Sequence, residues 1–464
     1  MPINIRINNI KKIYSLFWQS LSGETQDYTA GSLRKAIFLL SIPMILEMCM
    51  ESVFAVVDIF FVGRINKEAV TTVALTESVL TLVYSVAIGL SMAATAVVAR
   101  RVGEKKPEQA SQSAVQAILI ALAMTVVVSV AGYIFAPNIL HVMGASATVV
   151  DTGASYTRIV FGGSIVIMML YLVNGIFRGA GNASMAMWSL WIGNGCNIVL
   201  CPILIHVYGV KGAAMATTIG RGCGVCFQLY HLLRGTGAIH ILKRYFVPEW
   251  TMLKSLSAIA WTGTAQFLIG SASWIVLARI IAEFGDATVA GYQVALRILL
   301  FFLLPAWGMS NATATLVGQN LGAKQLKRAE ESVWKTAKYN AVFMFFVTLI
   351  FLFASEPIVA FMNPDADVKK IAVQVLHIVT AGYIFYGIGM VLINAFNGAG
   401  DTKTPTLISL FCFWTFQIPI AYLMSLKFGL GPKGVFFAII IAESTLTLVA
   451  FFIFRKGRWK TVEI

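Results

Sequence analysis

Long apolar stretches alternate with short polar ones along almost the whole chain. Apolar runs of 20 or more residues recur from Ala36 to Phe454, and a helix of about 20 apolar residues is needed to cross the hydrocarbon core of a bilayer. The pattern predicts an all-α polytopic membrane protein with twelve transmembrane helices. The expected spans are 37–63, 69–99, 111–136, 155–177, 184–206, 212–233, 255–284, 288–318, 336–356, 371–397, 405–427 and 433–455.

The chain also repeats itself at a constant offset of 219 residues. Segment 87–110 aligns with segment 306–329, and eight of the 24 aligned residues are identical. The same offset pairs the stretch from Phe177 to Gly181 with the stretch from Phe396 to Gly400. Such a repeat indicates duplication. Each half holds six spans, an even number, so we expect two parallel six-helix bundles related by a pseudo-two-fold axis along the membrane normal.

The duplication sets the expected division of the chain. In folds of this kind the substrate path lies between the two repeats, and transport proceeds by rocking one bundle against the other. The expected regions are a cytoplasmic N-terminal segment (1–35), an N-lobe (36–233), a cytoplasmic linker (234–254), a C-lobe (255–455) and a cytoplasmic tail (456–464).

Composition and charge agree with a membrane protein. The chain is 58% hydrophobic and 12% charged, with a formal net charge of +14. With the N-terminus inside, 24 of the 35 Lys and Arg residues fall on the inner side of the expected topology. This asymmetry is the positive-inside rule, so the basic excess reports topology rather than a nucleic-acid partner. We expect a monomer in the lipid bilayer of a bacterial inner membrane, with both termini in the cytoplasm.

Three carboxylates interrupt the first apolar run. Glu47, Glu51 and Asp58 fall within about 40° of one another on a helix. A carboxylate at membrane depth costs about 2.5–3.5 kcal/mol by insertion scales, so a chain rarely keeps one without a use. Glu77 and Arg221 lie at similar depth in other spans. We expect Asp58 to couple transport to an ion; the alternative is a structural ion pair between Arg221 and one of the acids.

Several motifs resemble the multidrug and toxic compound extrusion (MATE) family. They are Val-Asp-x-x-Phe-Val-Gly from Val57 to Gly63, Ala-Arg-Arg-Val-Gly-Glu from Ala99 to Glu104, Gly-Gln-Asn-Leu-Gly from Gly318 to Gly322, and Gly-Ala-Gly-Asp-Thr-Lys-Thr-Pro from Gly398 to Pro405. The resemblance covers about residues 35 to 455. It implies twelve helices in two lobes that form a V, with export driven by re-entry of protons or sodium ions.

The resemblance also implies an ion site in the N-lobe. In the DinF-like branch, an aspartate of the first span is joined by an Asn-x-x-x-Asp pair in the fifth. Asp58 and Asn197 match, but Cys201 stands where the second acid belongs. The NorM-like branch has acids in spans 7 and 10, and the corresponding stretches 261–274 and 383–394 contain none. The chain is therefore closer to the DinF-like branch, and Glu51, Glu47 or Glu77 must replace the missing acid, with Glu51 favoured.

Aromatic and thioether side chains suggest where a substrate would bind, because rings and sulfur atoms accept flat lipophilic cations in many orientations. Core packing explains such residues equally well. Glu443 aligns with Arg221, and it either attracts cations in a central cavity or pairs with Arg279 or Arg297. Pro43 should kink the first span below the acids. The candidate cavity residues are Met48, Tyr292, Gln293, Trp307, Tyr383, Tyr386 and Glu443.

These features predict an antiporter, coupled to protons or sodium ions, that exports amphipathic and often cationic small molecules such as drugs or toxins. A flippase for lipid-linked saccharides is the alternative within the same superfamily, although buried acids outnumber the candidate cavity arginines. We expect neither an enzyme nor a cofactor, since the sequence has no His-Glu-x-x-His, Gly-x-Ser-x-Gly or phosphate-binding loop.

Overall fold

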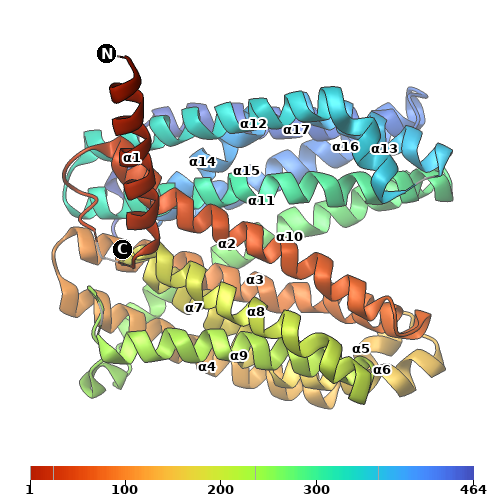
Figure 1. Cartoon of the computed structure of the whole chain (residues 1–464), viewed down its shortest axis with the longest axis horizontal. Coiled ribbons are helices and arrows are strands. Elements are labelled where there is room, and N and C mark those ends of the chain that lie inside the picture. Colours follow the sequence, from red (N-terminus) through yellow and green to blue (C-terminus); the bar gives the residue numbers. More distant parts are fainter. Residues whose placement is uncertain (1, 24–25, 236, 364) are drawn as a thin grey trace.

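A computed structural model describes residues 2–23, 26–235, 237–363 and 365–464, and the regular structure in these residues is helical throughout (Figure 1). The first half contains α1 (Pro2–Leu21), α2 (Leu33–Val62), α3 (Lys67–Gly103), α4 (Pro107–Ile134), α5 (Ala136–Val142), α6 (Ala147–Gly162), α7 (Ser164–Gly179), α8 (Ala183–Tyr208) and α9 (Val210–Arg234). After η1 (Lys243–Phe246), the second half contains α10 (Trp250–Ala282), α11 (Asp286–Gly322), α12 (Leu326–Met362), α13 (Ala366–Thr380), α14 (Tyr383–Ala399), α15 (Lys403–Ser409), η2 (Leu410–Gln417), α16 (Ile418–Tyr422), η3 (Leu423–Lys427), α17 (Pro432–Arg455) and η4 (Arg458–Thr461).

The helix boundaries repeat with the offset that the sequence predicts. Helices α3 and α11 are both 37 residues long, and they begin at Lys67 and Asp286. The non-glycine residues with positive φ in the described chain are Lys105 and Lys324, with φ of 58° and 59°, immediately before α4 and α12. Both members of each pair lie 219 residues apart. The two halves therefore share backbone geometry as well as sequence.

The fourth expected span of each half is divided at equivalent glycines. Gly163 separates α6 from α7, and Gly382 immediately precedes α14. Helices α13 and α14 are bent by 58° relative to each other. Within the described residues, nine helices are long and apolar enough to cross a membrane, or ten if α13 and α14 form one span. The other two of the twelve expected spans coincide with α2 and α9, which carry Glu51 and Arg221.

The halves come together at the end of the molecule that carries both termini, here called the terminal side. Towards the opposite end, the far side, the two groups of helices diverge and give a V (Figure 1). Helix α2 packs along α8 of its own half and α11 of the other, and α10 packs along α3. The first long helix of each half thus contacts the second helix of the other half, as in the contact of Gly308 with Met44 and Ile45.

On the terminal side, α3 and α11 cross at a pair of equivalent glycines. A Cβ on Gly103 would lie 2.0 Å from the carbonyl oxygen of Gln319, and a Cβ on Gly322 would lie 2.2 Å from that of Arg100. Gly103 and Gly322 are 219 residues apart, and so are Arg100 and Gln319. Because real Cβ atoms do not approach oxygen this closely, glycine at both positions permits the contact between the halves.

Two features were not predicted from the sequence. The N-terminal segment, expected only as a polar cytoplasmic stretch, contains helix α1, which extends away from the bundle on the terminal side (Figure 1). The expected span 405–427 contains two π-helical stretches, η2 and η3, whereas the equivalent α8 is α-helical throughout. Helix α2 continues unbroken through Pro43, so the predicted kink does not interrupt it.

Candidate functional site

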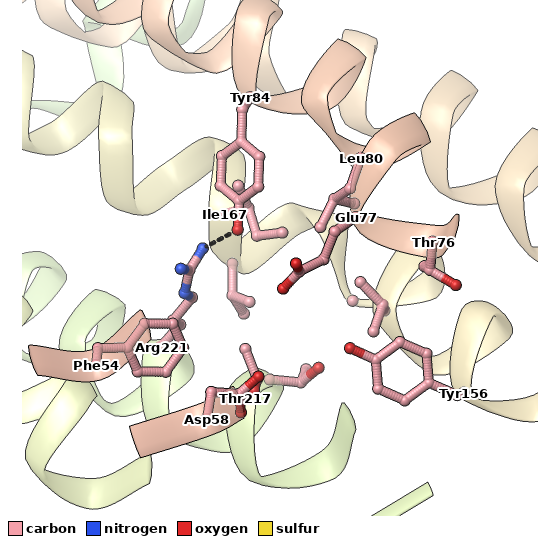
Figure 2. A pocket seen from close by; sticks show the side chains of 14 residues that line it. Phe54, Asp58, Thr76, Glu77, Leu80, Tyr84, Tyr156, Ile167, Thr217 and Arg221 are labelled. Carbon is pink, nitrogen blue, oxygen red and sulfur yellow. Dashed lines mark hydrogen bonds between the residues drawn. The ribbon is translucent and has the colours of Figure 1, made fainter. Parts of the chain in front are cut away.

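A pocket lies inside the N-terminal half, towards the far side. It is lined by α2, α3, α6, α7 and α9, and its polar side chains point toward a common space (Figure 2). The lining residues are Phe54, Asp58, Thr76, Glu77, Leu80, Tyr84, Tyr156, Val160, Gly163, Val166, Ile167, Thr217, Thr218 and Arg221. Of the six predicted ion-coupling residues, Asp58, Glu77 and Arg221 are among them.

Asp58 and Glu77 face the pocket from different helices. Asp58 belongs to α2 and is 7% exposed, and its Oδ1 atom is buried with no hydrogen-bond partner in the described residues. Glu77 comes from α3 and is exposed. Figure 2 shows both carboxylates directed into the pocket, with Tyr156 beside Glu77. The pocket therefore combines one buried acid with one that water can reach.

Arg221 is the cation of this region, and its guanidinium group is held on several sides. Its Nη1 atom donates to the hydroxyl of Tyr84 at 2.7 Å, and its Nη2 atom lies 3.3 Å from Glu51 Oε1. The group also lies over the ring of Phe54 at 5.2 Å, a cation–π contact. Arg221 is 3% exposed, so the ion pair expected between it and an acid of the first span is confirmed, and the acid is Glu51.

Glu51 is therefore turned away from the role in which the sequence favoured it. It does not line the pocket. Its Oε1 atom meets Arg221, and its Oε2 atom accepts a hydrogen bond from Asn194 at 3.2 Å. The acid that faces Asp58 across the pocket is Glu77 instead. Helical spacing places Glu51 near Asp58 on α2, but spacing alone does not report that α3 faces α2 across the pocket.

Glu47 lies closer to the terminal side, in a second polar cluster. Its Oε1 atom accepts from Asn174 at 3.1 Å and from Arg178 at 3.3 Å. Asn174 Oδ1 accepts in turn from Ser189 at 2.9 Å and from Gln228 at 2.6 Å. The partners of Glu47 were not predicted from the sequence, although isolated polar residues in apolar spans are a usable signal for such a cluster.

Asn197 lies behind the pocket wall. Its Nδ2 atom donates to Thr217 Oγ1 at 3.1 Å, and its Oδ1 atom is buried with no partner in the described part of the chain. Thr217 lines the pocket, whereas Asn197 and Cys201 do not. Cys201 is completely buried. The amide of Asn197 thus orients a pocket hydroxyl, and the position at which the resemblance implies an acid is occupied by a neutral thiol.

The charges of the N-terminal half divide into two classes. Glu51 and Glu47 are each paired with an arginine, so each pair is formally neutral. Asp58 and Glu77 form no ion pair with a cation in the described residues. A carboxylate that lacks a fixed counter-charge in a low-dielectric site favours a proton or a cation as its partner. The arrangement can therefore bind a small cation and release it to water through the exposed side of Glu77.

The predicted cavity residues of the C-terminal half separate into two groups. Tyr292, Tyr383 and Glu443 are buried in its interior, where Tyr292 stacks on Phe436 with ring centroids 6.2 Å apart. Tyr386 stacks on Tyr383 at 6.3 Å. Gln293 is exposed, while Trp307 and Met48 are partly exposed. The structure does not place these residues around a single cavity.

The expected pairing of Glu443 with an arginine is wrong. Arg279 instead pairs with Glu283 on the surface of α10, at 3.4 Å. Arg297 is exposed on α11, as are Gln293 and Leu300 on the same helical face. This face points away from the interior in which Glu443 is buried. Within the described residues, Glu443 Oε2 has no hydrogen-bond partner.

Comparison with known proteins is consistent with this architecture. The MatE family model matches residues 43–203 and 264–423, one segment in each half. The chain belongs to the MATE family. It is 25% identical to "Probable multidrug resistance protein NorM" of Thermotoga maritima, over 96% of this chain and 97% of that protein. It is 22% identical to "Multidrug export protein MepA" of Staphylococcus aureus, over 90% of this chain and 93% of that one.

Solved structures show the same relationship. "Crystal structure of MATE in complex with MaL6" matches with a TM-score of 0.89 and 26% identity, covering 94% of this chain and 99% of that chain. The all-helical, multi-pass fold expected from the sequence is thereby confirmed. As a MATE protein with relatives named for multidrug resistance and export, the chain is a multidrug efflux transporter and not an enzyme.

Proposed function

We propose that this MATE transporter is an ion-coupled antiporter that exports amphipathic, often cationic small molecules by alternating access. The coupling ion, a proton or a sodium ion, binds in the N-terminal pocket between Asp58 and Glu77. The DinF-like assignment belongs to the same proposal. It is supported by Asp58 on α2, by Asn197 on α8, and by the lack of acids in the C-terminal stretches 261–274 and 383–394.

One observation carries the proposal: Asp58 and Glu77 face one pocket while the nearby arginine is committed elsewhere. Arg221 binds Glu51 and Tyr84. A counter-ion fixed on Asp58 would neutralise it permanently and leave no reason for an external ion to bind. Without one, proton or sodium binding changes the net charge of the pocket, and this change is what coupling requires.

Helix α2 offers a route from ion binding to the shape of the molecule. Asp58 lies near its far-side end, inside the N-terminal half. Nearer the terminal side, Met44 and Ile45 of the same helix press against Gly308 of α11 in the other half. Pro43 stands next to this contact and leaves one helical carbonyl without its usual N–H partner. A shift of α2 on ion binding therefore acts on the interface between the halves.

The charge balance of the pocket also fits the proposed substrates. An exporter that exchanges a cation for a cationic drug needs negative charge that both can neutralise in turn. Glu77 supplies such charge at an exposed position. Met48 and Trp307, both partly exposed, add the soft apolar surface that lipophilic cations prefer.

The test is transport in reconstituted vesicles, with proton and sodium gradients imposed separately and efflux of a cationic dye as the readout. Asp58→Asn and Glu77→Gln keep the shape of each side chain and remove its charge. We expect either substitution to abolish gradient-driven efflux, with dye binding retained in detergent. Glu283→Gln, at an exposed acid outside the pocket, is the matched control and should transport normally.

Two results would contradict the proposal. If Asp58→Asn transported at the wild-type rate at equal protein levels, the pocket would not be the coupling site. If neither gradient drove export in the wild type, ion coupling itself would be excluded, and the flippase alternative would become the stronger one.

A further inference from the structure

Glu443 is a buried carboxyl group that the N-terminal site does not use. It lies in α17 and is 7% exposed, and its Oε2 atom has no hydrogen-bond partner in the described residues. Its neighbours along α17, Ile439, Ala442 and Leu446, are buried and apolar. An acid inside a membrane bundle is by default a candidate functional group.

Other unsatisfied polar groups are found in the same half. The hydroxyl oxygens of Tyr383 and Tyr292 and the Oε1 atom of Gln417 are buried and have no partner in the described chain. Tyr383 and Tyr386 of α14 interact electrostatically with Glu443, and so does Cys412 of η2. Buried polar groups are usually hydrogen-bonded, so several orphans in one half-bundle call for an explanation.

No positive charge is placed to neutralise Glu443. The lysines and arginines on the elements that pack against α17, and those on α17 itself, are exposed, and His377 of α13 is bonded to Ser355 at 2.7 Å. The groups with a resolved electrostatic interaction with Glu443 are Tyr383, Tyr386 and Cys412, which are neutral in their protonated forms. The exposed basic residues are Arg279 of α10, Lys369 of α13, Lys403 of α15, Lys427 of η3, and Lys433 and Arg455 of α17, with Lys370 also at the surface of α13.

These observations decide the form in which the group is carried. Burying an ionised carboxylate without a counter-ion is so costly that the group takes up a proton instead. A protonated carboxyl gains an O–H donor, and the unpartnered hydroxyl oxygen of Tyr383 can accept from such a donor. When the proton leaves, the same tyrosine can donate its O–H to the carboxylate.

We propose that Glu443 is a second proton-binding site, located in the C-terminal half and separate from the Asp58–Glu77 pocket. The carboxyl group binds one proton in the closed half-bundle shown here and releases it to water when that half opens during transport. The step is a simple dissociation, in which the O–H bond breaks and the electron pair stays on the carboxylate. This inference rests on the proposed function for its place in the transport cycle, but proton binding at Glu443 can be tested without transport.

The direct test is infrared difference spectroscopy of the full-length protein in lipid nanodiscs during pH titration. A protonated carboxylic acid has a carbonyl stretch that disappears on ionisation. We expect Glu443→Gln to remove one titrating band and keep the band of Asp58, and Asp58→Asn to do the reverse. Glu283→Gln, at an exposed acid, is the control that should leave both buried bands unchanged.

Tyr383→Phe sharpens the test, because it removes only the hydroxyl that faces the acid. We expect it to move the titration midpoint of the Glu443 band while leaving the Asp58 band in place. A structural role for Tyr383 would not shift one band selectively. A thermal unfolding curve confirms that each variant is folded.

The second readout is the number of protons released on binding of a cationic dye, measured in weakly buffered solution. We expect Glu443→Gln to reduce this number by about half, because linkage ties proton release to each titrating group. If Glu443→Gln changed neither the infrared bands nor the proton count, the proposal would be overturned. Failure of Asp58→Asn to affect efflux would reject the proposed coupling pocket, yet the Glu443 band would still report on this second site.

Discussion

The two halves of this transporter share one backbone design and have opposite interiors. Their helices begin at the same offset, and the special backbone positions Lys105 and Lys324 coincide. In the N-terminal half, however, buried charges are paired, as in Glu51 with Arg221 and Glu47 with Arg178. In the C-terminal half, Glu443 stands where Arg221 would be and has no cation partner in the described residues.

The comparison shows which properties a duplication conserves. Glycines at close helix contacts are kept in both halves, as at Gly103 and Gly322, because the backbone path depends on them. Interior polar residues are not under that constraint. After duplication each half can acquire its own chemistry without altering the contact between them, so one half can hold ion pairs and the other a lone acid.

The equivalent positions 221 and 443 should respond oppositely to the same substitution. Arg221→Met leaves Glu51 buried without its counter-charge, which we expect to cost about 3–5 kcal/mol of unfolding free energy. Glu443→Met replaces an unsatisfied carboxyl with an apolar chain, and we expect it to be neutral or stabilising. Unfolding by SDS in mixed micelles measures both free energies.

The double variant Arg221→Met/Glu51→Met is the internal control. It removes both partners, so it should recover most of the stability lost in the single variant. An equal loss in the single and double variants would show that Arg221 acts through packing on Phe54 rather than through its charge. A large loss at Glu443→Met would mean that the acid has a stabilising partner after all.

Sequence reasoning captured what apolar periodicity and duplication determine. All twelve expected spans coincide with a helix or a run of adjoining helices, because runs of apolar residues can satisfy their backbone in lipid only by coiling. The duplication predicted the shared helix starts for the same reason. The assignment to the MATE family followed from motifs that lie at the helix ends and is confirmed by the family match.

The parts that could not be predicted depend on how helices face one another. Spacing along α2 groups Glu51 with Asp58, but tertiary packing gives Glu51 to Arg221 and brings Glu77 of α3 to the pocket. Helix α1 was missed because a polar segment outside the membrane carries no span-length apolar run. The π-helical stretch η2 has no composition that distinguishes it from the α-helix expected there.

The glycine contact on the terminal side offers a test of what the halves have in common. Gly103→Ala and Gly322→Ala each place a Cβ against a backbone carbonyl of the other half, which must move away. We expect each to destabilise the closed terminal side by about 1–3 kcal/mol. Spin labels on the terminal ends of α3 and α11, with their separation measured by pulsed EPR, would report a shift toward wider distances in both variants.

Gly195→Ala is the matched control, since nothing lies within 4 Å of a Cβ built on this glycine of α8. It should leave the distances unchanged and stabilise the helix slightly, because alanine is the better helix former. A shift in only one of the two variants at the contact would show that the closed interface is less symmetric than its backbone.

Thr315 provides the smallest and most local test of asymmetry between the halves. Its hydroxyl, on α11, donates to the carbonyl oxygen of Arg178 at 3.0 Å across the interface, whereas the equivalent residue of α3 is Ala96. Thr315→Val removes this bond without changing the side-chain shape, and we expect a loss of about 1 kcal/mol of unfolding free energy. Thr313→Val is the control on the same helix, because the Thr313 hydroxyl is buried without a partner in the described residues. The control should be neutral or slightly stabilising, so equal losses in the two variants would rule out the cross-interface hydrogen bond as the cause.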